Sequence, residues 1–152
     1  MTAPETEPVL WAQGVDMVYA NGTQALEKVD LKIRPGEFVS LLGPSGCGKS
    51  TLLRLFAGLE SPTHGHLRWW NQPQLPEPAP GRTMAMVFQE ATLMPWANVL
   101  RNVQLPLDLS GVPVAEKDSR AREALRRVGL AGFEQARPRE LSGGMQMRVS
   151  IA

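Results

Sequence analysis

The sequence predicts an α/β fold followed by a mostly helical region, and three patterns support that prediction. Short apolar runs typical of strands recur in the first half of the chain. A glycine-rich segment joins one of these runs to an amphipathic stretch, as in a strand–loop–helix unit. From about residue 97 onward, apolar residues recur at helical spacing. We therefore expect an α/β core over residues 9–96 and a helical subdomain over residues 97–152.

The composition is that of an ordinary globular domain. The chain has 152 residues, of which 43% are hydrophobic and 20% are charged, enough for one domain with a hydrophobic core. The formal net charge of +1 gives no global electrostatic argument for nucleic acid as a partner. The single cysteine, Cys47, excludes an internal disulfide and favours a reducing compartment. Because no apolar run approaches the roughly 20 residues that cross a bilayer, we expect a cytoplasmic protein.

The elements of the first half follow in order. Residues 1–8 are polar and proline-rich, and we expect a disordered tail there. Alternating apolar and charged residues predict a half-buried strand over residues 29–33, and the mostly apolar run over residues 37–42 is typical of a buried parallel strand. A helix is predicted over residues 49–57, with Gly58 suited to its C-terminal cap.

Two more strand signals lie at residues 66–70 and 83–88. Between them is a predicted loop, because proline lacks the N–H group that a ladder or helix needs. The prolines of that loop are Pro73, Pro76, Pro78 and Pro80.

The helical half has two apolar stripes. The first consists of Val99, Val103 and Leu107, with Pro106 interrupting the pattern, and the second of Ala121, Leu125 and Val128. Four arginines are predicted on the outer face of the second helix: Arg120, Arg122, Arg126 and Arg127. Acidic residues interleave with them, so this pattern favours a solvated helix face over a nucleic-acid surface.

Residues 43–51, which read GPSGCGKST, match the phosphate-loop pattern G-x-x-x-x-G-K-[ST]. The glycines let the backbone approach an anion closely, and its N–H groups and the start of the following helix favour negative charge there. Lys49 would reach the β- and γ-phosphates, and the Ser50 hydroxyl would ligate Mg²⁺. A glycine-rich turn could match by chance, but the flanking strand and helix favour binding of a purine nucleoside triphosphate, with ATP preferred.

The predicted triphosphate-binding residues are Gly43, Pro44, Ser45, Gly46, Cys47, Gly48, Lys49, Ser50 and Thr51.

Three further segments identify the kind of phosphate-loop protein. Tyr19 lies upstream in DMVYANGTQAL, Gln89 ends the run MAMVFQE, and residues 141–145 read LSGGM. In that order, they closely resemble the ATP-binding subunit of ABC transporters, over nearly the whole chain from about Val9 to Ala152. The segment QEATLMPWANVLRNV, residues 89–103, resembles the nitrate/sulfonate/taurine import branch of that family.

This resemblance implies a P-loop NTPase core with an N-terminal antiparallel β part and a helical subdomain that carries the signature motif. It implies an ATPase in which Tyr19 stacks on adenine and Gln89 touches Mg²⁺ and the attacking water. Gln89 is thus the expected catalytic residue, and with Ser50 an expected metal ligand. Each residue also has an ordinary interpretation: a strand-end tyrosine packed on the sheet, and a solvated glutamine.

The resemblance also implies that residues 141–145 bind the γ-phosphate of ATP held by the opposite subunit. The motif consists of Leu141, Ser142, Gly143, Gly144 and Met145. Ser142 can cap a helix N-terminus, and the glycines leave backbone N–H groups bare toward an anion. Met145 stands where the family usually has glutamine. An ordinary Ser-Gly-Gly helix start is the alternative.

The implied partners are a second ATP-binding subunit in a head-to-tail dimer, two transmembrane permease subunits and, indirectly, a solute-binding protein. Such a subunit would be peripheral on the inner face of the cell membrane, importing a small anionic solute. Met94, Pro95 and Trp96 could form a hydrophobic docking knob for the permease, and for Trp96 a place in the helical core is an equal alternative.

The family's Asp-Glu strand, known as Walker B, and its switch histidine would follow Ala152. The chain's own His64 and His66 lie too early for the switch histidine and are interpreted as turn and strand residues. We therefore expect an N-terminal fragment, truncated before the Walker B strand, that binds Mg-ATP without hydrolysing it. The alternatives are a non-catalytic nucleotide-binding module and a non-transport ABC ATPase.

Overall fold

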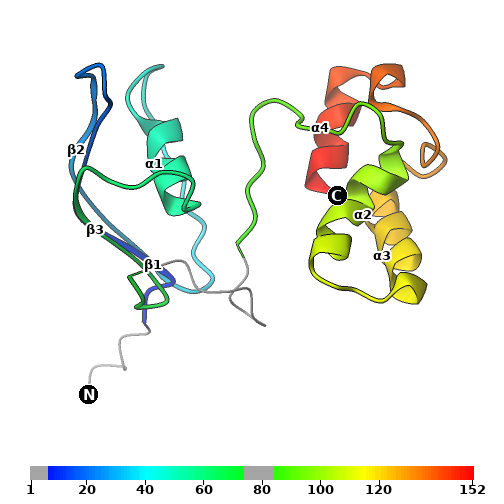
Figure 1. Ribbon diagram of the computed structural model, residues 1–152, viewed down its shortest axis with the longest axis horizontal. Coiled ribbons are helices and arrows are strands. Elements are labelled where there is room, and N and C mark those ends of the chain that lie inside the picture. The colour runs from blue at the N-terminus through cyan, green and yellow to red at the C-terminus, as the bar shows by residue number, and fades with distance from the viewer. Residues whose placement is uncertain (1–6, 74–83) are drawn as a thin grey trace. The chain divides into compact units, whose positions relative to one another are not determined.

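A computed structural model describes residues 7–73 and 84–152. Most of the expected N-terminal tail and of the proline-rich loop, including Pro76, Pro78 and Pro80, lies outside the described residues. The chain divides into two compact units, residues 1–85 and residues 86–152. Figure 1 shows strands with one helix in the first unit and helices in the second.

The first unit contains a three-stranded antiparallel sheet and one helix. The strands are β1 (Leu10–Val18), β2 (Gln24–Ile33) and β3 (His64–Trp69), in the order β2-β1-β3. The helix α1 (Lys49–Phe56) lies along one face of the sheet (Figure 1). The indole Nε1 of Trp69 donates to the carbonyl oxygen of Phe56 at 2.7 Å, which ties β3 to the end of α1.

The core of this unit is formed by apolar residues from all four elements. Its buried members are Leu10, Ala12, Val15, Leu26, Leu52, Leu55, Phe56, Leu67 and Trp69.

A tight hairpin turn joins β1 to β2. The N–H of Gly22 donates to Tyr19 O at 2.8 Å, and the N–H of Tyr19 donates to Thr23 O at 2.9 Å. Gly22 has a φ of +81°, which an L side chain rarely adopts, and Asn-Gly is a strong hairpin signal. The turn leaves Tyr19 directly after the last residue of β1.

Several predicted elements are confirmed. The strand predicted over residues 29–33 forms the second half of β2, and the strand predicted at residues 66–70 lies within or next to β3. Helix α1 ends as expected, with Gly58 at a φ of +69° after the cap residue Ala57. There the N–H of Gly58 donates to Leu55 O and that of Leu59 to Arg54 O, the hydrogen-bond pair of a Schellman motif.

Two predicted strands are wrong. Residues 37–42 and the described residues 84–88 form no strand, and Phe38 and Leu42 are 94% and 91% exposed. A parallel strand exists only through hydrogen bonds to its neighbours. Among the described residues, the sheet consists of β1, β2 and β3, and none of them pairs with either run. Apolar composition alone therefore does not make these segments strands.

The second unit contains three α-helices around one apolar cluster. They are α2 (Val99–Leu109), α3 (Val114–Arg127) and α4 (Gly143–Ile151), with a 3₁₀ turn, η1 (Pro138–Glu140), before α4. Its buried residues are Val99, Leu100, Val103, Ala121, Leu125, Leu130, Leu141 and Val149. None of the helices in the described part of the chain is both long and apolar enough to span a membrane.

Pro106 interrupts the apolar pattern but does not end α2, which continues to Leu109. Val103 and Leu107 on either side of it pack against the same apolar cluster. Their packing maintains the helix although proline removes one backbone hydrogen bond.

The predicted outer face of α3 is confirmed, because Arg120, Arg122, Arg126 and Arg127 are all exposed. Arg126 and Arg127 both donate to the Glu123 carboxylate, which lowers the pKa of that carboxyl to about 2. Arg122 donates to Asp118 at 2.7 Å. Three of the four arginines thus form ion pairs on a solvated face.

The helical core supplies a stability test. Leu125 is fully buried in α3, whereas Leu109 at the end of α2 is 82% exposed. We expect Leu125→Ala to lower the free energy of unfolding by about 2–5 kcal/mol, because it leaves a cavity. Leu109→Ala is the matched control and should change it by less than about 0.5 kcal/mol. Urea denaturation followed by far-ultraviolet circular dichroism measures both, and equal losses would contradict this account of the core.

Candidate functional site

The glycine-rich loop leads directly into α1, and its conformation requires glycine. Gly46 and Gly48 have φ values of +81° and +90°. A Cβ atom on Gly48 would lie 2.3 Å from the carbonyl oxygen of Ala25 and 2.8 Å from Cδ2 of Leu26. The end of the loop therefore packs directly against the backbone of β2, which fixes where α1 begins.

The N-terminus of α1 suits an anion. Its cap residue is Gly48, which supplies no side-chain hydrogen bond, and the first turn holds no acidic residue. The first N–H groups of any helix have no acceptor within the helix. Together with the positive end of the helix dipole, they favour a negatively charged group at this point.

Lys49 brings a positive charge to the loop. Its Nζ donates to the carbonyl oxygens of Gly43 at 2.8 Å and Pro44 at 2.6 Å, and lies 3.4 Å from Sγ of Cys47. Ser50, in the first helical turn, is exposed. One ammonium group, bare backbone donors and a hydroxyl within a few residues fit a polyphosphate with a divalent cation.

Tyr19 lies beside this helix start. Its hydroxyl is 3.0 Å from Oγ1 of Thr51 and donates to Oε2 of Glu60 at 3.2 Å. Its side chain is half-buried. The structure thus brings Tyr19 together with the loop region, from which it is separated by 32 residues in the sequence. Glu60 is a residue that the sequence analysis missed.

The other predicted site residues belong to the second unit. Ser142 caps α4, as expected, and its Oγ accepts from the N–H of Met145 at 3.3 Å. Gly143 and Gly144 are the exposed first residues of α4, and Leu141 is buried behind them. Gln89 is exposed in a bend before α2. The roles of these residues toward a nucleotide remain predictions.

Trp96 is not part of the helical core. Its side chain is 75% exposed. Asn102 fixes the segment that carries it, because the Asn102 side chain accepts from the N–H of Met94 at 2.7 Å and donates to Asn98 O at 3.0 Å. The core alternative for Trp96 is therefore wrong. His64 and His66 both lie in β3 and are exposed.

Comparisons with known proteins identify the family that the chain resembles. The ABC transporter family model matches residues 26–152. The chain is 47% identical over 146 residues to the taurine import ATP-binding protein TauB of Burkholderia pseudomallei, covering 94% of this chain and 55% of that protein. It is 43% identical over 145 residues to the spermidine/putrescine import ATP-binding protein PotA of Salmonella typhimurium, covering 95% of this chain and 38% of that protein. The chain spans about half the length of the curated relatives it matches.

A solved structure has the same fold. The dimeric structure of the ATP-binding cassette MJ0796, in a post-hydrolysis state bound to ADP and Pi, matches with a TM-score of 0.83 and 35% identity. The match covers 93% of this chain and 67% of that chain.

The packing of the loop on β2 can be tested with two glycines. Gly46→Ala adds a Cβ in open space, so it should cost only the left-handed backbone penalty of about 1–2 kcal/mol. Gly48→Ala has that penalty and also places its Cβ against Ala25, which we expect to cost about 1–3 kcal/mol more. Urea denaturation gives both values, and equal losses would refute the close packing at Gly48.

Proposed function

This chain belongs to the ABC transporter family, and we propose that it is the ATP-binding, energy-coupling subunit of an ABC importer. The observation that supports this most directly is the loop at the start of α1. Its uncapped helix N-terminus, its left-handed glycines and the ammonium group of Lys49 are all features that a triphosphate needs. In this proposal the loop from Gly43 to Thr51 holds the phosphates.

We propose a small anion of the nitrate, sulfonate or taurine type as the solute. TauB, a relative at 47% identity, is named for taurine import. PotA is named for import of spermidine and putrescine and is 43% identical, so overall identity separates these solutes from taurine poorly. The segment from Gln89 to Val103 supports the anionic branch by its resemblance to that branch.

Within the site, each proposed role matches the chemical group of the side chain that would perform it. Lys49 would contact the β- and γ-phosphates, and the Tyr19 ring would stack on adenine. Ser50 and Gln89 would hold Mg²⁺, which when bound neutralises charge that develops on the phosphates. The Gln89 amide would also orient water. These assignments combine the geometry of the loop with the roles that the family resemblance implies.

We propose that the subunit pairs head-to-tail with a second ATP-binding subunit. The exposed start of α4 supports this, because Gly143 and Gly144 have no side chains that would cover its backbone. These residues, with Leu141, Ser142 and Met145, would bind the γ-phosphate of ATP held by the partner subunit. MJ0796, which has the same fold, forms a dimer.

The remaining partners would be two permease subunits and, through them, a solute-binding protein. Trp96 supports a permease contact, because a large exposed apolar side chain on a fixed segment is typical of an interface. The subunit would then be cytoplasmic and peripheral on the inner face of the membrane.

Nucleotide binding tests the central part of this proposal. We expect Lys49→Ala to weaken the binding of a fluorescent ATP analogue at least about tenfold, since charge-assisted hydrogen bonds to phosphate are lost. Lys32→Ala removes an exposed lysine of β2 and serves as the matched control. Equal affinity of wild type and Lys49→Ala would refute the role of Lys49.

We further propose that residues 1–152 by themselves bind Mg-ATP without turnover, because they hold no Asp-Glu pair that ends an apolar strand. Purified residues 1–152 should release inorganic phosphate from Mg-ATP no faster than their Lys49→Ala variant. Phosphate release that Lys49→Ala abolishes would overturn this part of the proposal.

A further inference from the structure

The hydroxyl of Tyr19 lies in a short chain of polar contacts that the sequence patterns do not account for. It is 3.0 Å from Oγ1 of Thr51 and 3.2 Å from Oε2 of Glu60. The other carboxylate oxygen of Glu60, Oε1, lies 3.6 Å from Nη1 of Arg54. These contacts thus run from the first turn of α1, through Tyr19 and Glu60, to the last turn of the same helix.

The direction of these hydrogen bonds follows from counting protons. A phenol hydroxyl has one proton, and the ionised carboxylate of Glu60 can only accept. Tyr19 therefore donates to Glu60, and the Thr51 hydroxyl donates to Tyr19. Because the Thr51 hydroxyl proton is used in this way, the contact of Thr51 with a phosphate would come from its backbone N–H.

The fold places Glu60 beside Tyr19 through two local features. The Schellman turn at Gly58 reverses the chain after α1. Thr63 then ties the following segment to β1, because its Oγ1 accepts from the N–H of Val18 at 2.9 Å and its N–H donates to Asp16 O at 2.9 Å. Glu60 thus lies just after the end of α1, and these contacts hold it next to Tyr19, the residue that follows Val18.

Burial indicates that these contacts are fixed. Thr51 is 8% exposed, and the side chains of Tyr19 and Glu60 are only partly exposed. A half-buried tyrosine held at its hydroxyl has little freedom to rotate, while the faces of its ring take no part in these hydrogen bonds.

We propose that Glu60 is a positioning residue for nucleotide binding: it holds the Tyr19 ring at a fixed place beside α1, where the ring meets the adenine of a nucleotide whose phosphates lie on the loop. This inference rests on the proposed ATP binding. Stacking of a base on an aromatic ring is favourable, but a ring that must first be ordered loses part of that gain as conformational entropy. In the free protein, the hydrogen bonds to Glu60 and Thr51 already order the Tyr19 ring, so nucleotide binding does not have to lose that conformational entropy.

The test compares a ligand that has a base with one that has none. In the full chain, we expect Glu60→Ala to weaken binding of a nonhydrolysable Mg-ATP analogue about three- to tenfold, the effect of one lost hydrogen bond. Binding of Mg-tripolyphosphate, which lacks the base, should stay unchanged. Equal weakening of both ligands, or no weakening of either, would overturn the positioning role.

Two further variants keep the test decisive if Glu60→Ala folds poorly. Tyr19→Phe retains the ring and loses both hydroxyl contacts, so it should reproduce the selective loss, and Glu60→Ala should then add nothing to it. Glu60→Gln keeps a neutral acceptor and should retain part of the affinity. An additive effect of Tyr19→Phe and Glu60→Ala would refute the coupling.

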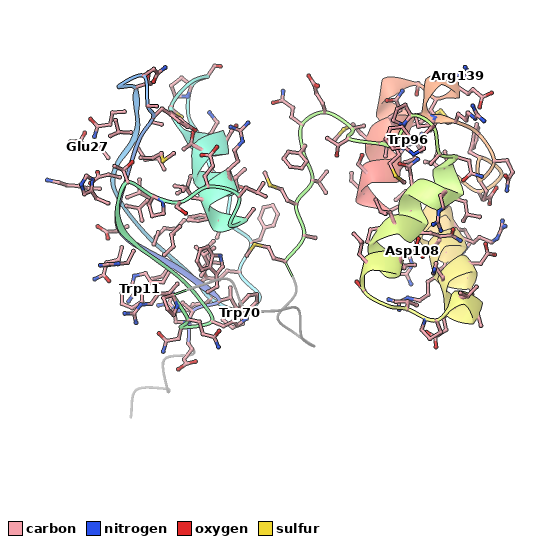
Figure 2. The ribbon with its side chains drawn as sticks, viewed as in Figure 1. Trp11, Glu27, Trp70, Trp96, Asp108 and Arg139 are labelled. Carbon is pink, nitrogen blue, oxygen red and sulfur yellow. The ribbon has the colours of Figure 1, made fainter. Side chains whose placement is uncertain are left out.

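The matched control is Glu27→Ala, because Glu27 is an exposed glutamate of β2 that points away from the unit (Figure 2). It should bind both ligands as the wild type does. Failure of the proposed function has a different signature, since the wild type would then bind neither ligand.

Discussion

The packing of α1 against the sheet of the first unit is the constraint on which the candidate site depends. Leu52, Leu55 and Phe56 are buried on the sheet, and the Trp69 indole holds the last carbonyl of the helix. At the other end, Gly48 lies so close to the β2 backbone that no side chain fits between them. Because both ends of α1 are fixed, its first turn has one position. That position determines where the loop, Lys49 and the contacts of Tyr19 lie.

The local parts of this arrangement could be predicted from the sequence. The pattern of residues 43–51 predicts the loop and the helix after it, and Ser142 predicts the start of α4, because caps and phosphate loops depend on residues only a few positions apart. The runs over residues 37–42 and 83–88 show the limit. Their apolar residues suggested buried strands, but a strand is defined by pairing, and the described sheet contains no partner for residues 37–42 or 84–88. Composition cannot supply that information.

The environment of Tyr19 could not be predicted for a related reason. Thr51 and Glu60 are 32 and 41 residues from it in the sequence, and each reaches it through a different local structure. The hairpin turn at Gly22 leaves Tyr19 directly after β1, and the Schellman turn at Gly58 returns the chain toward β1. Each turn has a glycine signal, but the meeting of the two depends on how α1 packs on the sheet. The interpretation of Tyr19 as a strand-end residue packed on the protein is therefore compatible with a role in binding, because the hydrogen bonds are made by the hydroxyl and not by the ring faces.

The starts of α1 and α4 differ in a way that bears on how a shared ATP site would work. At α1 no side chain caps the helix and a lysine lies within the loop, so a phosphate would itself satisfy the first N–H groups, and binding there is expected to be strong. At α4 the Ser142 hydroxyl already accepts from Met145, and the first turn has no acidic or basic residue. An anion at α4 would find only the remaining backbone donors and the helix dipole. In the proposed head-to-tail dimer, binding at α4 should therefore be the weaker of the two and depend on the phosphate already being held by the loop of the partner subunit.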